Sequence, residues 1–186
     1  MRFKSTTALA TAGILAGGVA FAAGDDGPFG FGEVATQQEI AAIDIDVMPD
    51  GRGLPPGSGS VSDGKAVYQA ECAACHGEDL QGIKETGAAA LIGGRGSIGT
   101  PETKKTIESY WPYASTVFDY IHRAMPFHAP GSLSSDQVYA VTAYILHRAD
   151  IVPAEAVMSA ETLPRVEMPN RDGFIADPRP DVRTYR

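Results

Sequence analysis

Apolar residues recur at helical spacing within residues 62–152, most clearly near the end of that region. There the apolar face consists of residues three or four positions apart: Val138, Val141, Thr142 and Ile145. The preceding run Leu133-Ser134-Ser135-Asp136-Gln137-Val138 pairs a Ser N-cap with a Gln three residues later and brackets both with apolar side chains. This is the pattern of a capping box with a hydrophobic staple. We therefore expect a helix that starts at Ser134 and cannot continue through Pro153.

Three earlier stretches also predict helices, and no internal repeat is evident. Ser62 is a candidate cap for a helix that carries Tyr68 and Cys72 on one stripe and ends near Gly77. The pair Thr100-Pro101 predicts a second start, with Pro at the first helical position. A third helix is expected from Tyr113 to Ala124, closed by Pro126. Because every element recognised in residues 62–152 is helical, the fold class is predicted to be all-α.

The segments on either side of this region lack a sustained period. Residues 23–61 contain one short candidate helix, Thr36 to Ala42, followed by several Pro and Gly residues that favour turns and loops. Residues 153–186 contain five prolines and no helical or strand period. We expect irregular N- and C-terminal extensions around a domain at 62–152, lying on a surface of the domain or of a partner.

Residues 1–22 have the features of a secretory signal peptide: a basic start, an apolar run and an Ala-Phe-Ala exit. The run is too short and too rich in Gly and Ala to span a bilayer, so we expect export to the periplasm without stable membrane insertion. Without this segment, 13 basic and 23 acidic side chains leave a formal charge of −10. Nucleic acid is therefore not an expected partner.

The sequence Cys72-Ala73-Ala74-Cys75-His76 holds both cysteines of the chain. On a helix, positions 72, 75 and 76 share one face, which is the arrangement that attaches a haem through two thioether bonds and offers His76 to its iron. Two other sites use the same residue types: a zinc site would need further ligands, and a thioredoxin-like dithiol would need a preceding strand. A motif of only five residues can also occur by chance. A disulfide here would close almost no loop. A small helical domain with long Gly-rich joints also lacks a core of its own, which a haem would supply. We therefore predict one covalently attached haem c.

A second iron ligand is expected from the far side of the haem, and seven side chains are candidates: Met48, Met125, Met158, Met168, His122, His128 and His147. Met125 is favoured because Pro126 directs the preceding residue out of the helix into an extended loop. Met168-Pro169 is the same dipeptide but lies in the irregular tail, and His128 is the nearest rival. We expect His122 and His147 to be solvated. Two axial side chains would leave the iron no vacancy, which indicates one-electron transfer rather than catalysis.

Further residues are candidates for the haem surroundings. Aromatic residues crowd the region around Met125, and we expect them to form the haem wall: Tyr110, Trp111, Tyr113, Phe118, Tyr120 and Phe127. Tyr68 and Leu91 are two further expected haem contacts. Arg95 could bind a haem propionate through its guanidinium, with a solvated loop side chain as the equal alternative.

With Cys72 to His76 and Met125 in these places, residues 62–152 resemble a class I c-type cytochrome. In that fold, Gly64, Tyr68 and Tyr144 look like the contact at which the first and last helices cross. The resemblance implies short helices around one haem, with His76 and Met125 as its iron ligands.

A narrower resemblance covers nearly all of the chain after the signal peptide. It is carried by IDIDVMPDGRGLPPGSGSV from Ile43, SYWPYASTVFDYIHRAMPF from Ser109 and MPNRDGFIADPRPDV from Met168. These blocks are similar to the cytochrome subunits of bacterial sulfite and sulfane dehydrogenases. The resemblance implies a separate molybdenum-cofactor subunit as electron donor and a downstream cytochrome or oxidase as acceptor. The longer sulfane dehydrogenase cytochromes have two haem modules, whereas this chain has one Cys-x-x-Cys-His.

Two other functions stay open from the sequence. An independent mobile carrier between a respiratory complex and a terminal oxidase or reductase needs no permanent partner. A haem enzyme, such as a peroxidase, would need an open iron or a displaced Met.

Overall fold

The computed structural model describes residues 31–178, in two units that are described separately: residues up to Ile43, and those from Asp44 onward. The signal peptide expected at residues 1–22 lies outside the described residues. In the first unit, helix α1 (Gln37–Ile43) confirms the short helix expected here. Its start is capped by Thr36, whose Oγ1 accepts from the Glu39 amide at 3.2 Å, while the Glu39 carboxylate accepts from the Thr36 amide at 2.8 Å.

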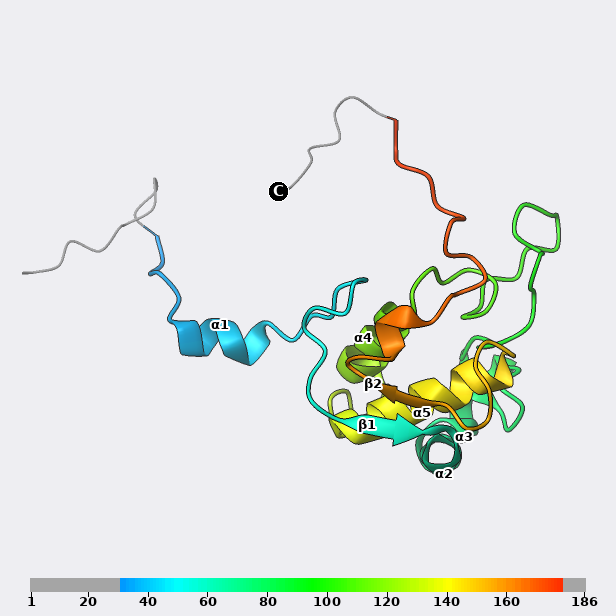
Figure 1. Ribbon diagram of the computed structural model, residues 1–186, viewed down its shortest axis with the longest axis horizontal. Helices are drawn as coiled ribbons and strands as arrows, with labels where there is room; N and C mark the ends of the chain where they lie inside the picture. The colour runs from blue at the N-terminus through cyan, green and yellow to red at the C-terminus, as the bar shows by residue number, and fades with distance from the viewer. Residues whose placement is uncertain (1–30, 179–186) are drawn as a thin grey trace, which may run out of the picture. The chain divides into compact units, whose positions relative to one another are not determined.

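The second unit is built mainly of helices, which confirms the all-α cytochrome c fold (Figure 1). Its elements in chain order are β1 (Ser58–Ser60), α2 (Val61–Glu71), α3 (Ala73–His76), the 3-10 helix η1 (Lys84–Thr86), α4 (Ala114–Ala124), α5 (Ser135–Arg148), β2 (Val157–Ser159) and the 3-10 helix η2 (Leu163–Arg165). No helix within residues 31–178 is long and apolar enough to cross a membrane.

Helices α2 and α5 cross at a point where one residue has no side chain. A Cβ on Gly64 would lie 1.8 Å from the Ala140 carbonyl oxygen, so the two backbones could not approach this closely with any other residue. Beside this point the rings of Tyr68 and Tyr144 pack with their centroids 5.3 Å apart. The crossing contact that the resemblance implied is therefore present in the structure.

Helices α4 and α5 form where the sequence predicts them. Ser134 Oγ accepts from the Gln137 amide at 3.3 Å, and the Gln137 side chain accepts from the Ser134 amide at 2.9 Å, which completes the expected capping box. Most of α5 is buried, because α2, α4 and the strand pair all pack against it. Helix α4 ends at Ala124, and Met125 is extended with φ −125° and ψ 148°.

Three expectations about local structure were wrong. The N-cap of α2 is Ser60, whose Oγ accepts from the Asp63 amide at 3.1 Å, and not Ser62. The helix does not run on to Gly77: it stops at Glu71, and Cys72 separates it from the single turn of α3. Thr100-Pro101 starts no helix, because residues 97–103 form successive turns in which hydroxyl groups bond to nearby carbonyls, as Thr103 Oγ1 does to Thr100 O at 2.7 Å.

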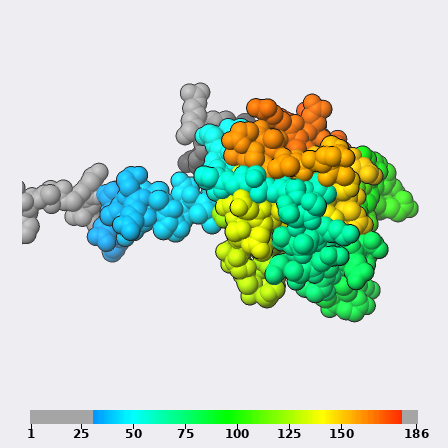
Figure 2. Space-filling view, turned by 60° about the horizontal axis from the view of Figure 1, so that its bottom comes forward, coloured from blue at the N-terminus to red at the C-terminus, as the bar shows by residue number. Residues whose placement is uncertain are grey.

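The flanking segments of the second unit contain the two strands, which the sequence did not indicate. Strands β1 and β2 pair antiparallel with Gly59 opposite Met158, and Figure 2 shows the two segments side by side on the surface. A Cβ on Gly59 would lie 2.2 Å from the Ala140 amide nitrogen, so the pair packs closely on α5. Apolar side chains from the C-terminal segment reach the core: Met158, Leu163, Val166 and Met168. The expected surface extension is thus part of the folded core.

Candidate functional site

A cavity of about 560 Å³ opens in the second unit, within the range of ~300–1,000 Å³ typical of ligand sites. Its walls come from the α2–α3 junction, the loop at residues 86–91, the loop at 105–111, α4 with the residues after it, and α5. Most of the lining is apolar. The cavity therefore lies where segments far apart in the sequence converge.

Cys72, Cys75 and His76 line this cavity together. Both cysteines are free thiols. Burial, with a further contribution from the neighbouring Glu71 carboxylate, raises the pKa of the Cys72 thiol to about 11, so this thiol is protonated at neutral pH. The two sulfurs are thus available for bonds to a group in the cavity.

The His76 ring is oriented by the backbone. Its Nδ1 lies 2.8 Å from the Ala89 carbonyl oxygen. Because a carbonyl can only accept, Nδ1 carries the proton, and in the neutral ring Nε2 keeps a free lone pair. This is the arrangement in which a histidine binds a metal through Nε2.

Tyr68 lies behind the cysteine motif and does not line the cavity. Its hydroxyl donates to the Gly77 carbonyl at 2.7 Å, in a buried position directly after His76. Burial is the main cause that raises the pKa of this phenol. Tyr68 therefore supports the turn that ends the motif, and its role is one of positioning.

Met125 lines the same cavity from the end of α4. Of the six rival ligands considered above, His128 also lines it. Met48 is 45% exposed, whereas Met158 and Met168 are buried in the apolar core. His122 and His147, which we expected to be solvated, are partly buried: Nδ1 of His122 is buried without a hydrogen-bond partner among the described residues, and Nδ1 of His147 lies 3.1 Å from the Val152 carbonyl oxygen.

The remaining expected contacts divide into two groups. Leu91 and Trp111 line the cavity, and Trp111 packs edge-on against Tyr120 with ring centroids 5.7 Å apart. Arg95 does not line it, because its guanidinium donates to the carbonyl of Ala149. Among the aromatic residues, Tyr120 and Phe127 line the cavity, while Tyr110, Tyr113 and Phe118 do not.

Sequence reasoning missed several apolar residues of the lining. They come from separate loops and helices: Ile107, Val117, Ile121, Leu133 and Ile145. The sequence signals were the helical spacing of Val117 and Ile121, the place of Leu133 in the hydrophobic staple and the place of Ile145 on the apolar face of the last helix. The Ala89 carbonyl that orients His76 had no signal at all, since a backbone group carries none.

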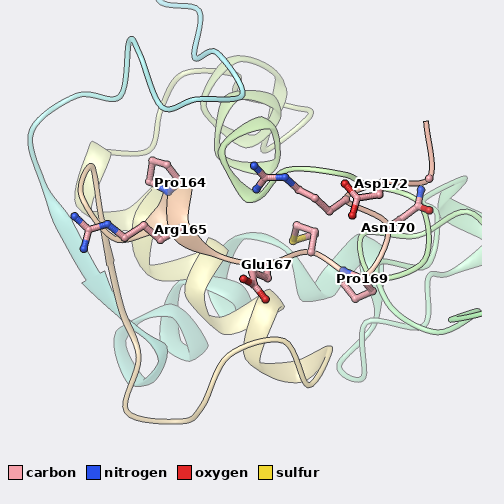
Figure 3. Close-up of a pocket in the computed structure, with 9 residues that line it drawn as sticks. Pro164, Arg165, Glu167, Pro169, Asn170 and Asp172 are labelled. Atoms are coloured by element: carbon pink, nitrogen blue, oxygen red, sulfur yellow. The ribbon is translucent and has the colours of Figure 1, made fainter. Parts of the chain in front are cut away.

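A second cavity, of about 710 Å³, is lined by residues between Pro164 and Gly173 (Figure 3). Its side chains are of mixed charge and include none of the thiols or imidazoles discussed above. One of them, Asn170, donates through Nδ2 to the Tyr110 carbonyl at 2.7 Å, next to Trp111. This C-terminal segment therefore braces the loop that forms one wall of the first cavity.

The residues of the first cavity fit a covalently attached haem. They provide two thiols, an imidazole with a free Nε2, a thioether and apolar walls, which together are the donor set and surroundings of a c-type haem. A structural zinc site would need four ligands, and the described residues contain no cluster of three or more His, Cys, Asp or Glu placed to hold a metal ion.

Comparison with known proteins agrees with this chemistry. The cytochrome c family model matches residues 61–149. Among solved structures, the chain is similar to the sulfane dehydrogenase SoxCD from Paracoccus pantotrophus, with 45% sequence identity and a TM-score of 0.74 over 82% of this chain and 74% of that chain.

A curated relative is the thiosulfate dehydrogenase of Stutzerimonas stutzeri (strain A1501), which is 31% identical over 93 residues. The aligned part makes up 49% of this chain and 28% of that protein, so the chain spans less than a third of its length. The family implies a covalently bound haem c. The chain belongs to the cytochrome c family of electron carriers, and it resembles a chain of the sulfane dehydrogenase SoxCD.

Proposed function

We propose that this protein is a periplasmic cytochrome with a single haem c, attached through Cys72 and Cys75 and ligated by His76 and Met125. One observation carries the proposal: these four side chains line one largely apolar cavity, although Met125 follows His76 by 49 residues in the sequence. No other described methionine lines that cavity.

The protein's own residues determine what the bound group can do. Haem supplies an iron that accepts and releases one electron at a time. His76, held by the Ala89 carbonyl, presents Nε2 from one segment, and Met125 presents its thioether from another. If His76 and Met125 both bind the iron, a substrate would have no coordination position on it. A Met thioether paired with a His imidazole also raises the reduction potential.

The ligand assignment is tested by two matched substitutions, Met125→Leu and Met168→Leu. Both methionines precede a proline, but Met125 lines the cavity and Met168 is buried in the core. We expect Met125→Leu to keep its haem, to lose the weak red-edge absorption band of the ferric Met–iron bond, and to bind cyanide rapidly. Met168→Leu should keep the band. A band that survives in Met125→Leu would contradict the assignment, because another methionine would then be the iron ligand. A wild type without the band would instead direct attention to His128.

For the physiological role, we propose an electron-accepting subunit of a molybdenum sulfite or sulfane dehydrogenase. The likeness to SoxCD supports this, since it covers 82% of the chain and so extends beyond residues 61–149 into the flanking segments. The signal-like residues 1–22 support a periplasmic location. The chain would then take electrons from the molybdenum subunit and pass them to a downstream cytochrome or oxidase.

This role predicts co-purification with a molybdenum protein. The protein should be isolated from native periplasm at low and at high salt, and the fractions tested for reduction of the haem spectrum by sulfite. We expect sulfite to reduce the haem when a molybdenum protein is present and to leave the isolated cytochrome oxidised. A cytochrome that elutes without a molybdenum protein at every salt concentration would instead support the mobile carrier.

A further inference from the structure

Helix α4 has two opposite rows of side chains, and only one row faces the cavity. Val117 and Ile121 line the cavity, and Met125 is the next position in this row. A second row, Ser115, Asp119 and Arg123, is displaced from the first by two residues. Since an α-helix turns about 100° per residue, the second row lies roughly 200° around the helix, on the face away from the cavity.

The second row is covered by residues 44–50, here named the strap, which precede the family match at residues 61–149. Ser115 Oγ donates to the Pro49 carbonyl at 2.8 Å, and the Val47 amide donates to Asp119 Oδ1 at 2.9 Å. Arg123 donates to both carboxylate oxygens of Asp119 and also pairs with Asp46 at 3.5 Å. Each residue of the row therefore contacts the strap directly, and Asp119 also binds Arg123.

The bonds of Ser115 to Pro49 and of Val47 to Asp119 are partly buried, whereas Arg123 and Asp46 pair at the surface. Ser115 is 1% exposed, Val47 is 5% exposed, and the Asp119 side chain is 13% exposed. A carboxylate that accepts from a backbone amide and from a guanidinium forms charge-assisted hydrogen bonds, about twice as strong as neutral ones. Asp119 thus joins the strap, the middle of α4 and its last turn.

We propose that Asp119 is a positioning residue, through which the strap holds α4 against the haem cavity and keeps Met125 on the iron. The inference rests on the proposed ligand role of Met125. Met125 is the C-cap of α4, and its amide donates to the Ile121 carbonyl at 3.0 Å, so a shift of the helix end moves the thioether with it.

The chain offers a matched control in Asp136. Its Oδ1 accepts from the Ser58 amide at 2.7 Å, so it also ties the segment before α2 to a helix. That helix is α5, which does not lead into Met125. The variants Asp119→Ala and Asp136→Ala therefore each remove an aspartate that receives a backbone amide, but only the first loosens α4.

The test compares both variants with the wild type, all loaded with haem in the ferric state. Cyanide can bind only when Met125 leaves the iron, so its binding rate reports on that ligand. We expect Asp119→Ala to bind cyanide about tenfold faster, which corresponds to the loss of one charge-assisted hydrogen bond. The variant should also show a weaker red-edge band. Asp136→Ala should stay within about twofold of the wild type. Urea unfolding of both variants separates this effect from a general loss of stability.

Two results would overturn the inference: a wild-type cyanide rate in Asp119→Ala, or an equal acceleration in Asp136→Ala. Should Asp119→Ala fail to fold, Ser115→Ala removes only the bond to Pro49 and should accelerate binding about threefold. An unchanged rate in that variant would equally contradict the role of the strap. If the wild type itself lacks the band and binds cyanide at once, the ligand role of Met125 is wrong and the inference falls with it.

Discussion

Gly64 shows how one residue sets the separation of two helices. Any side chain here would meet the Ala140 carbonyl, and the Tyr144 Cβ lies 2.8 Å from the Cβ position. We therefore expect Gly64→Ala to force α2 and α5 apart and to lower the free energy of unfolding by about 3 kcal/mol or more. Urea unfolding measures this, with the exposed neighbour Lys65→Ala as a control expected to stay within about 0.5 kcal/mol. A Gly64→Ala protein as stable as the control would show that the helices adjust freely.

The Asp119 carboxyl also predicts a pH dependence of stability. Burial alone would raise its pKa, but the hydrogen bonds from Arg123 and the Val47 amide outweigh burial and hold the pKa below the ordinary 3.8. A pKa that is lower in the folded than in the unfolded state adds stability above the unfolded value, and this stability is lost as pH falls through the folded value.

We therefore expect the stability difference between the wild type and Asp119→Asn to be constant near neutral pH and to shrink below about pH 4. Unfolding curves between pH 7 and pH 3 measure this difference. Because both proteins carry the same haem and histidines, the comparison removes the titration of those groups. A difference that stays constant down to pH 3 would contradict the lowered pKa of Asp119.

At the scale of elements, helices with strong local signals could be predicted and elements set by distant contacts could not. The capping box at Ser134 and Gln137 is complete within four residues, so α5 was correctly placed. Ser60 and Ser62 are both plausible caps, and the choice of Ser60 depends on strand β1 ending there. The three-residue strands pair across almost a hundred positions and have no alternation that a sequence could show.

The C-terminal segment tests the view that the flanks belong to the core. Leu163 in η2 is fully buried, and η2 packs against α4. We expect Leu163→Ala to cost about 2–5 kcal/mol in the free energy of unfolding, as for other buried leucines. Val157→Ala is the control, since Val157 is 48% exposed in the same segment. Equal stability of the two variants would mean that this segment lies loosely on the surface.

For the whole molecule, the haem-binding residues could be predicted from the sequence, whereas most of the cavity lining around them could not. Cys72, Cys75 and His76 are adjacent in the chain, so their pattern is visible at once. Met125 could be selected because Pro126 imposes an extended backbone on it. Apolar residues such as Ile107 and Ile145 become lining residues only when the fold brings their segments together, and Arg95 is turned away by a carbonyl 54 residues later.

The attachment of haem to this chain is the central claim, and the intact mass of the protein tests it most directly. The protein should be produced in cells that carry a cytochrome c maturation system and then denatured before mass spectrometry. We expect a coloured protein with the mass of the processed polypeptide plus one haem, and loss of that added mass when Cys72 and Cys75 are both replaced by Ala. A colourless protein with the mass of the polypeptide alone would contradict the account.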